Sequence, residues 1–218
     1  MKRVVILFDL DGTVIDSTEA ILDGFRVAFE SLGGEVPSDE AIKNEVGHTL
    51  EDMFLKLGVA KDRVDEYVDA YKMHYRIISC QKTVLLDGAK EAIEEASRFA
   101  TLGVVTTKTG EYSRILLEHL GLMHYFSVLI GREDVQNPKP HKEPILKALE
   151  KIEHDKSRTW MIGDTCMDIE SAKSAGVNAI AVTSGYASFE VLQKCATLIN
   201  SNLCQAVKYI KKSDKNYK

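Results

Sequence analysis

Short apolar runs rich in β-branched residues recur along the chain, and they constrain the fold more than any other sequence feature. The first run, Val4–Phe8, has no alternation of polar and apolar positions. This is typical of a strand buried on both faces. Similar runs follow at 102–106, 127–130, 159–162, 179–183 and 197–199, and helical patterns separate most of them. This alternation predicts a doubly wound, parallel α/β sheet.

One long interruption separates the first run from the second. Residues 17–81 show helical periodicity and no convincing strand. Apolar spacing predicts a first helix from Ser17 to Gly33-Gly34, and further helices near 38–42, 49–57 and 64–75. We therefore predict a core domain over 1–15 and 83–218, with an inserted α-helical domain over 16–82.

The composition limits which binding partners and which cellular compartment we expect for this protein. The chain has 218 residues and a formal net charge of -5, whereas nucleic-acid binding needs an excess of Lys and Arg, so we expect no nucleic-acid partner. No apolar segment is long enough to span a bilayer, and the first run ends at Asp9, too early for a signal peptide. We expect a cytoplasmic protein, monomeric or weakly dimeric, with a frayed basic tail over 211–218. Its four cysteines form no C-x-x-C or zinc pattern and are expected to be reduced; they are Cys80, Cys166, Cys195 and Cys204.

Polar side chains stand at the ends of four of the predicted strands or in the loops after them. Ligands bind beside the carboxyl ends of the strands in an open parallel sheet, so these residues are expected to share one site. In chain order they are Asp9, Asp11, Thr106, Thr107, Lys108, Lys139, Asp164 and Asp168.

Several carboxylates at one site repel one another unless a cation offsets their charge, and hard oxygen ligands favour magnesium over zinc. Magnesium in turn attracts phosphate. A phosphoryl group needs neutralisation and positioning, which the metal, a lysine and short hydroxyl donors supply. One carboxylate is suited to act as nucleophile and a second as acid and base.

Four motifs, in order and at the right spacing, resemble the haloacid dehalogenase superfamily, and specifically its phosphoglycolate phosphatase-like branch with a helical cap. The resemblance spans nearly the whole chain. The matching segments are residues 8–13 for the first motif, 104–108 for the second, Lys139-Pro140 for the third, and Gly163-Asp164 with Asp168 for the fourth.

The resemblance implies that Asp9 is the nucleophile and Asp11 the general acid and base. The Asp9 carboxylate, the Asp11 backbone carbonyl and Asp164 would hold Mg²⁺. Asp168 would support the metal through water or through Lys139. The helical insertion would be the cap that closes over a small substrate.

Substrate contacts are also implied, with Thr106 and Lys139 gripping the phosphoryl group. Some of the other candidates have equally simple structural explanations: Ser17 suits a helix N-cap, Lys72 a solvated surface position, and the Gly47-His48-Thr49 segment a helix boundary. The full set of candidate substrate-binding residues is Gly12, Thr13, Asp16, Ser17, His48, Lys72, Thr107 and Lys108.

Two positions depart from the family pattern. Thr107 stands where Asn is common, and Lys142 replaces a proline in the loop after Lys139. A threonine hydroxyl still donates one hydrogen bond, so activity is expected to survive.

The sequence therefore predicts a Mg²⁺-dependent phosphatase of small phosphorylated metabolites, with phosphoglycolate as the leading substrate. Pyrophosphate and nucleotide monophosphates are the alternatives. A dehalogenase would lack Asp11 and Asp164, and a β-phosphoglucomutase-like mutase would carry His where Ile21 stands. An inactive phosphate-binding regulator is the alternative from a different class.

Overall fold

The computed structural model describes residues 3–214, which form a six-stranded sheet in the order β5-β4-β1-β6-β7-β8. Every neighbouring pair in this sheet is parallel. The predicted runs are confirmed as strands, with ends shifted by one to two residues. Their bounds are β1 Val4–Phe8, β4 Ala100–Val105, β5 Phe126–Ile130, β6 Thr159–Gly163, β7 Asn178–Val182 and β8 Ile199–Asn200.

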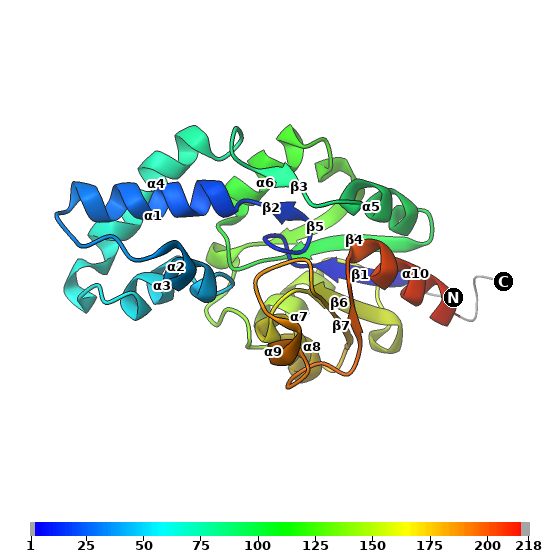
Figure 1. Cartoon of the computed structure of the whole chain (residues 1–218). Helices are drawn as coiled ribbons and strands as arrows, with labels where there is room; N and C mark the ends of the chain where they lie inside the picture. The colour runs from blue at the N-terminus through cyan, green and yellow to red at the C-terminus, as the bar shows by residue number, and fades with distance from the viewer. Residues whose placement is uncertain (1–2, 215–218) are drawn as a thin grey trace.

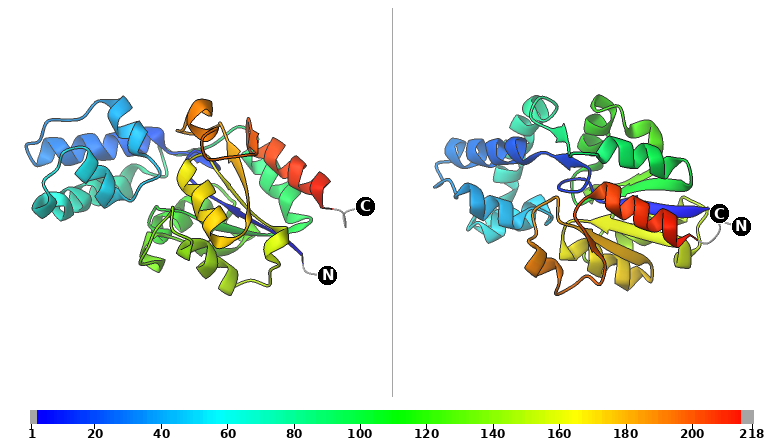
Figure 2. Two further views of the ribbon diagram at one scale, coloured as in Figure 1. Left: turned by 90° about the horizontal axis from the view of Figure 1, so that it is seen from below. Right: turned by 45° about the vertical axis from the view of Figure 1, so that its right-hand side comes forward.

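Helices cover both faces of this sheet (Figure 2). The side chains of β1 alternate between the faces, as strand geometry requires. Ile6 and Phe8 belong to a core shared with α5 (Ala89–Ser97), α6 (Gly110–His119) and α10 (Leu203–Ser213). Val5 and Leu7 belong to a second core shared with α7 (Glu143–Glu150) and α8 (Cys166–Ala175). Burial on both faces explains why β1 reads as a continuous apolar run.

The strand order places a topological switch point at β1. From β1 the chain builds outward to β4 and β5, then returns to β6 on the other side of β1. Loops that leave β4 and β6 therefore diverge on either side of the end of β1, which is where α/β sheets bind ligands. Asp9 is the first residue after β1.

Between β2 and β3 the chain forms a helical cap with an aromatic core of its own, drawn in blue to cyan in Figure 1. The rings of Phe25 and Phe54 lie 4.6 Å apart, and Phe25 also packs against Tyr71. Thr49 caps its helix by accepting a hydrogen bond from Asp52 N at 3.2 Å. The predicted helices are confirmed as α1 Thr18–Ser31, α2 Asp39–Glu45, α3 Leu50–Lys56 and α4 Val64–Ile78.

A two-stranded antiparallel ribbon joins cap and core, and no sequence pattern predicts it. It pairs β2 (Ile15–Asp16) with β3 (Val84–Leu85). Strands of two residues are too short to show periodicity. The domain boundaries at 15/16 and 82/83 stay a prediction. The remaining short elements are η1 Lys61–Arg63, η2 Met123–Tyr125, η3 Arg132–Asp134, η4 Lys156–Arg158 and α9 Phe189–Leu192.

Two sequence expectations are wrong. Cys166 and Cys195 form a disulfide, while Cys80 and Cys204 are free thiols. The pair is 29 residues apart in sequence, and the sheet brings the start of α8 beside the segment after α9. The tail does not fray at 211–213, because α10 extends to Ser213; residues 215–218 lie outside the described part of the chain. Within 3–214, no helix has the length and apolar character needed to cross a membrane.

Candidate active site

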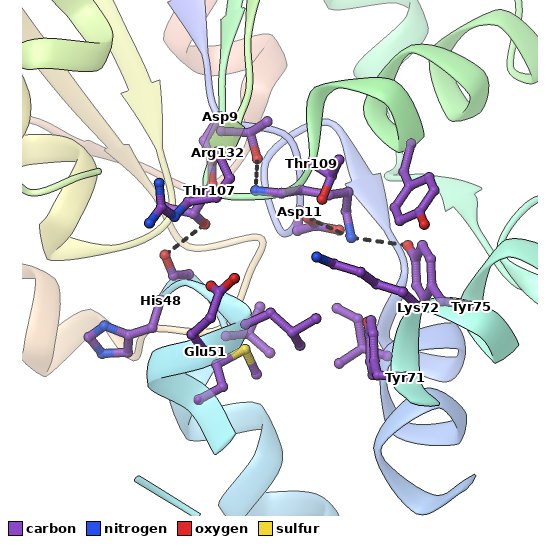
Figure 3. Close-up of a pocket in the computed structure, with 18 residues that line it drawn as sticks. Asp9, Asp11, His48, Glu51, Tyr71, Lys72, Tyr75, Thr107, Thr109 and Arg132 are labelled. Atoms are coloured by element: carbon purple, nitrogen blue, oxygen red, sulfur yellow. Dashed lines mark hydrogen bonds and ion pairs between the residues drawn. The ribbon is translucent and has the colours of Figure 1, made fainter. Parts of the chain in front are cut away.

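A cavity of about 80 Å³ lies between core and cap, and five of the predicted strand-end residues line it: Asp9, Asp11, Thr106, Thr107 and Lys108. Lys139, Asp164 and Asp168 do not line this cavity. Figure 3 shows Asp9 and Asp11 on the core side, with Glu51 and Lys72 reaching in from the cap. Such a cavity has room for only a few water-sized groups. It therefore suits a small ligand.

Lys139 lies at the centre of a buried charge cluster. Its Nζ donates to Asp9 Oδ1 at 2.7 Å, to Asp168 Oδ1 at 2.6 Å and to the carbonyl of Val105 at 3.1 Å. Burial disfavours the ammonium, but the carboxylates of Asp168 and Asp9 outweigh it and raise the pKa of Lys139 above its ordinary value. Burial raises the pKa of Asp9 to about 7, against the opposing charge of Lys139.

Asp164 is fully buried beside this cluster. Its Oδ2 accepts the backbone N–H of Tyr186 at 2.8 Å, and Thr13 Oγ1 donates to its Oδ1 at 3.4 Å. Burial, together with the charges of Asp9 and Asp168, raises its pKa well above the ordinary value. Gly12 has φ +78°, and a side chain there would collide with the Asp164 carboxylate. Gly12 and Thr13, predicted as substrate contacts, therefore position Asp164.

A divalent cation fits this donor set. Carboxylate oxygens of Asp9, Asp164 and Asp168 lie within 4.8 Å of one another. The Oδ2 of Asp168 already accepts from the backbone N–H and the hydroxyl of Thr165, at 3.1 Å and 2.7 Å, and its Oδ1 binds Lys139. Asp9 and Asp164 therefore offer the less engaged oxygens, and hard oxygen donors suit Mg²⁺.

Asp11 is held from two sides. Ser17 Oγ donates to its Oδ1, and Lys108 Nζ lies 3.2 Å from its Oδ2. Ser17 occupies the N-cap position of α1 without capping it through its side chain, whereas Asp16 accepts from the backbone N–H of Thr18 at 2.9 Å. Asp16 is exposed and does not line the cavity. Ser17 therefore contacts Asp11 in place of the side-chain cap expected of it, and Asp16 bonds locally to Thr18.

The second motif connects core and cap. Lys108 Nζ also donates to the hydroxyl of Tyr75 on α4 at 3.0 Å. Burial opposes its charge, but Asp11 and the neighbouring tyrosines raise the pKa of Lys108 well above the ordinary value. Thr107 Oγ1 donates to the carbonyl of Gly47 in the cap at 2.9 Å. Thr106 lines the cavity, and its Oγ1 accepts the backbone N–H of Lys108 at 3.2 Å.

The two predicted cap residues both line the cavity, but differently. His48 turns its ring away from the centre of the cavity in Figure 3. Its Nε2 lies 2.6 Å from Lys56 Nζ. Burial, followed by the charge of Lys56, lowers the pKa of His48. The ammonium of Lys72 points into the cavity in Figure 3.

Sequence reasoning missed Glu51 and Arg132, which also line the cavity. Among residues 3–214, Glu51 Oε2 and Arg132 Nε are buried atoms without a hydrogen-bond partner. Arg132 comes two residues after β5, so the strand-end rule applied to the third predicted core strand would have found it. Glu51 follows the Gly47-His48-Thr49 segment and carries no signal separating it from a solvated helix residue.

Comparison with known proteins places the chain in a family. The profile of haloacid dehalogenase-like hydrolases matches residues 6–182. The chain is 35% identical over 189 residues to "Pyrophosphatase PpaX" of Halalkalibacterium halodurans, covering 86% of each chain. It is 32% identical over 186 residues to "Phosphoglycolate phosphatase" of Aquifex aeolicus, covering 84% of this chain and 85% of that relative.

A solved structure agrees with the sequence comparisons. The haloacid dehalogenase-like family hydrolase from Streptococcus pneumoniae superposes with a TM-score of 0.86 at 27% identity, over 95% of this chain and 98% of that one. Fold, motif order and family profile all point the same way. The chain belongs to the haloacid dehalogenase-like hydrolase family.

Proposed function

We propose that this protein is a Mg²⁺-dependent phosphatase that hydrolyses small phosphomonoesters through an aspartyl phosphate on Asp9. The observation that carries the proposal is the buried Asp9, held by Lys139 at the end of β1 and facing the same small cavity as Asp11. Family membership and relatives named as phosphatases support the same reaction class.

Asp9 is the proposed nucleophile. Its Oδ1 accepts from Lys139, which leaves the second oxygen to attack phosphorus while the bond to the leaving oxygen breaks. Water then attacks the phosphorus of the acyl phosphate, which releases inorganic phosphate and regenerates the Asp9 carboxylate. Lys139 and Thr106 provide a cation and a hydroxyl for the transferring phosphoryl group.

Asp11 is the proposed acid and base. It would give its proton to the leaving oxygen in the first half-reaction and take one from water in the second. Ser17 and Lys108 fix its carboxylate, so both residues act by positioning Asp11. Lys108 also bonds to Tyr75 of the cap, so the placement of Asp11 depends on cap closure.

Mg²⁺ is the proposed cofactor, held by the Asp9 carboxylate, the Asp11 backbone carbonyl and Asp164. When bound, it would neutralise charge on the phosphoryl group. The observation that supports a cation is the packing of three buried carboxylates around a single lysine. Asp168 would act through Lys139, which engages its Oδ1.

Phosphoglycolate and pyrophosphate are the first substrates to test, because relatives carry both names. Ile21 lines the cavity where the mutase branch would place His, which favours hydrolysis over phosphoryl transfer between sugar positions.

The proposed mechanism is tested with Asp9→Asn, assayed for phosphate release from p-nitrophenyl phosphate and from these metabolites with and without Mg²⁺. We expect release by the parent protein to require Mg²⁺ and the variant to lose it while keeping its circular dichroism spectrum. Undiminished turnover by the folded variant would overturn the nucleophile assignment.

A further inference from the structure

We infer, resting on the phosphatase activity proposed above, that Glu51 selects phosphate esters whose leaving alcohol carries a hydrogen-bond donor. The donor is a hydroxyl or an ammonium group close to the ester oxygen. Glu51 is the second residue of α3, and its carboxylate faces the cavity across from Lys72 in Figure 3.

One oxygen of the Glu51 carboxylate accepts no hydrogen bond. Its Oε2 is buried and has no hydrogen-bond partner among residues 3–214. A buried acceptor without a donor destabilises the protein relative to one that is satisfied. A ligand that brings a donor to this oxygen therefore binds with a gain that a donor-free ligand lacks.

The neighbouring cations do not satisfy Glu51. Lys56 is engaged with Glu45 at 2.8 Å and with His48 at 2.6 Å. Arg132 donates through one terminal nitrogen to the carbonyl of Val135 at 3.1 Å. Within the described chain, neither Arg132 nor Lys72 forms an ion pair with Glu51. The acceptor is thus left for the ligand.

The cap also lines the cavity with apolar side chains. They are Ile21, Val46, Leu50 and Met53. A polar leaving group therefore finds Glu51 on one side and the Lys72 ammonium on the other. A hydroxyl can serve both, because it donates to a carboxylate and accepts from an ammonium.

Charge sets the order of preference among small esters. A leaving group that ends in a carboxylate or a second phosphate brings a negative charge towards Glu51, and like charges in a partly desolvated cavity repel. Glu51 thus disfavours anionic leaving groups, whereas Lys72 attracts them. Removing the charge of Glu51 is therefore expected to improve the hydrolysis of esters with an anionic leaving group.

The experiment compares four two-carbon esters that differ only at the end of the leaving group: ethyl phosphate, 2-hydroxyethyl phosphate, 2-aminoethyl phosphate and phosphoglycolate. For each we measure kcat and KM with Mg²⁺ for the parent protein and for Glu51→Gln. Dividing the two values of kcat/KM for one ester cancels its intrinsic reactivity. We expect Glu51→Gln to lower kcat/KM about tenfold for the ammonium ester, mainly through KM, because the charged acceptor is lost. The hydroxyl ester should lose less, because the amide oxygen of Gln still accepts a hydrogen bond, although a weaker one. Ethyl phosphate should change little, and phosphoglycolate should improve.

Glu40→Gln is the matched control, because Glu40 is an exposed cap carboxylate outside the cavity, and it should leave all four ratios near one. A larger loss for the ammonium ester than for the hydroxyl ester identifies an ionic contact, and the reverse identifies a hydroxyl ligand; both support the inference. An equal loss for all four esters, or a loss confined to phosphoglycolate, would overturn it. If the inference fails in this way but p-nitrophenyl phosphate is still hydrolysed, the proposed phosphatase function stands. If no ester releases phosphate, both the inference and the proposed function are overturned.

Discussion

The Nζ of Lys139 lies 2.7 Å from Oδ1 of Asp9, although 130 residues separate the two in sequence. The same ammonium contacts Asp168 at 2.6 Å, so one buried cation bridges two buried carboxylates. This bridge joins the loop after β5 to the end of β1 and to the first turn of α8.

Lys139→Met should therefore be costly for stability as well as for activity. It leaves Asp9 and Asp168 buried without their cation, and removing one partner of a buried pair typically costs about 3–5 kcal/mol. Urea unfolding at neutral pH without metal measures the loss. Lys142→Met, at an exposed position of the same loop, should change the free energy of unfolding little. Adding Asp9→Asn to Lys139→Met should restore part of the loss; a further loss would contradict the bridge.

Metal affinity should increase as the pH rises through neutrality. Burial raises the pKa of Asp9 to about 7 in the metal-free protein, so below that pH a cation must displace a proton from it. We expect affinity to change by up to about tenfold per pH unit below pH 7 for one displaced proton, and less above it. Titration calorimetry in two buffers of different ionisation enthalpy counts the protons released. Equal affinity at pH 5.5 and 7.5 would refute this coupling.

The raised pKa of Asp9 also determines how the stability of the metal-free protein changes with pH. The folded protein keeps the Asp9 proton up to about pH 7, while the unfolded chain loses it near the ordinary aspartate pKa of 3.8. The contribution of Asp9 to stability therefore falls as the pH rises between those two values. Asp9→Asn should flatten this dependence in urea unfolding without metal.

Thr107 should act on cap closure. Its hydroxyl donates to the carbonyl of Gly47 at 2.9 Å and so joins the end of β4 to the cap. Thr107→Val removes the donor while keeping the shape, and the loss of about 0.5–1.5 kcal/mol for one hydrogen bond should raise KM about two- to tenfold. Thr107→Ser should preserve the parent value. Thr101→Val, at the opposite end of β4, is the control. An unchanged KM in Thr107→Val would show that this bond does not limit closure.

The disulfide should raise the free energy of unfolding, and a reductant should abolish this stabilisation. Cys166 and Cys195 close a loop with a sequence separation of 29. The chain-entropy estimate for a loop of this size is about 3–4 kcal/mol. Cys195→Ser should lower the free energy of unfolding by up to this amount and make it insensitive to dithiothreitol. Cys204→Ser removes a free thiol and should leave the response to dithiothreitol intact. A parent protein whose unfolding ignores reductant would contradict the pairing.

The sequence by itself determined the sheet, the helical insertion and the motif residues. Val4–Phe8 could be identified as a doubly buried strand because such a strand must be apolar at every position, and Asp9 could be placed at its end because the run stops there. The four motifs then restricted the chemistry, since each delivers an oxygen or an ammonium to the same edge of the sheet.

Only the tertiary structure decided which of these groups touch. Lys139 could be anticipated near the site, but its bridge between Asp9 and Asp168 is a contact across long sequence separations that no local pattern encodes. The same holds for Thr107 and the Gly47 carbonyl, and for the Cys166–Cys195 bond. Glu51 is the clearest case. On a helix its sequence context is that of any solvated carboxylate, and it becomes a candidate for selecting the leaving group only because the cap packs over the core and buries its oxygen without a donor.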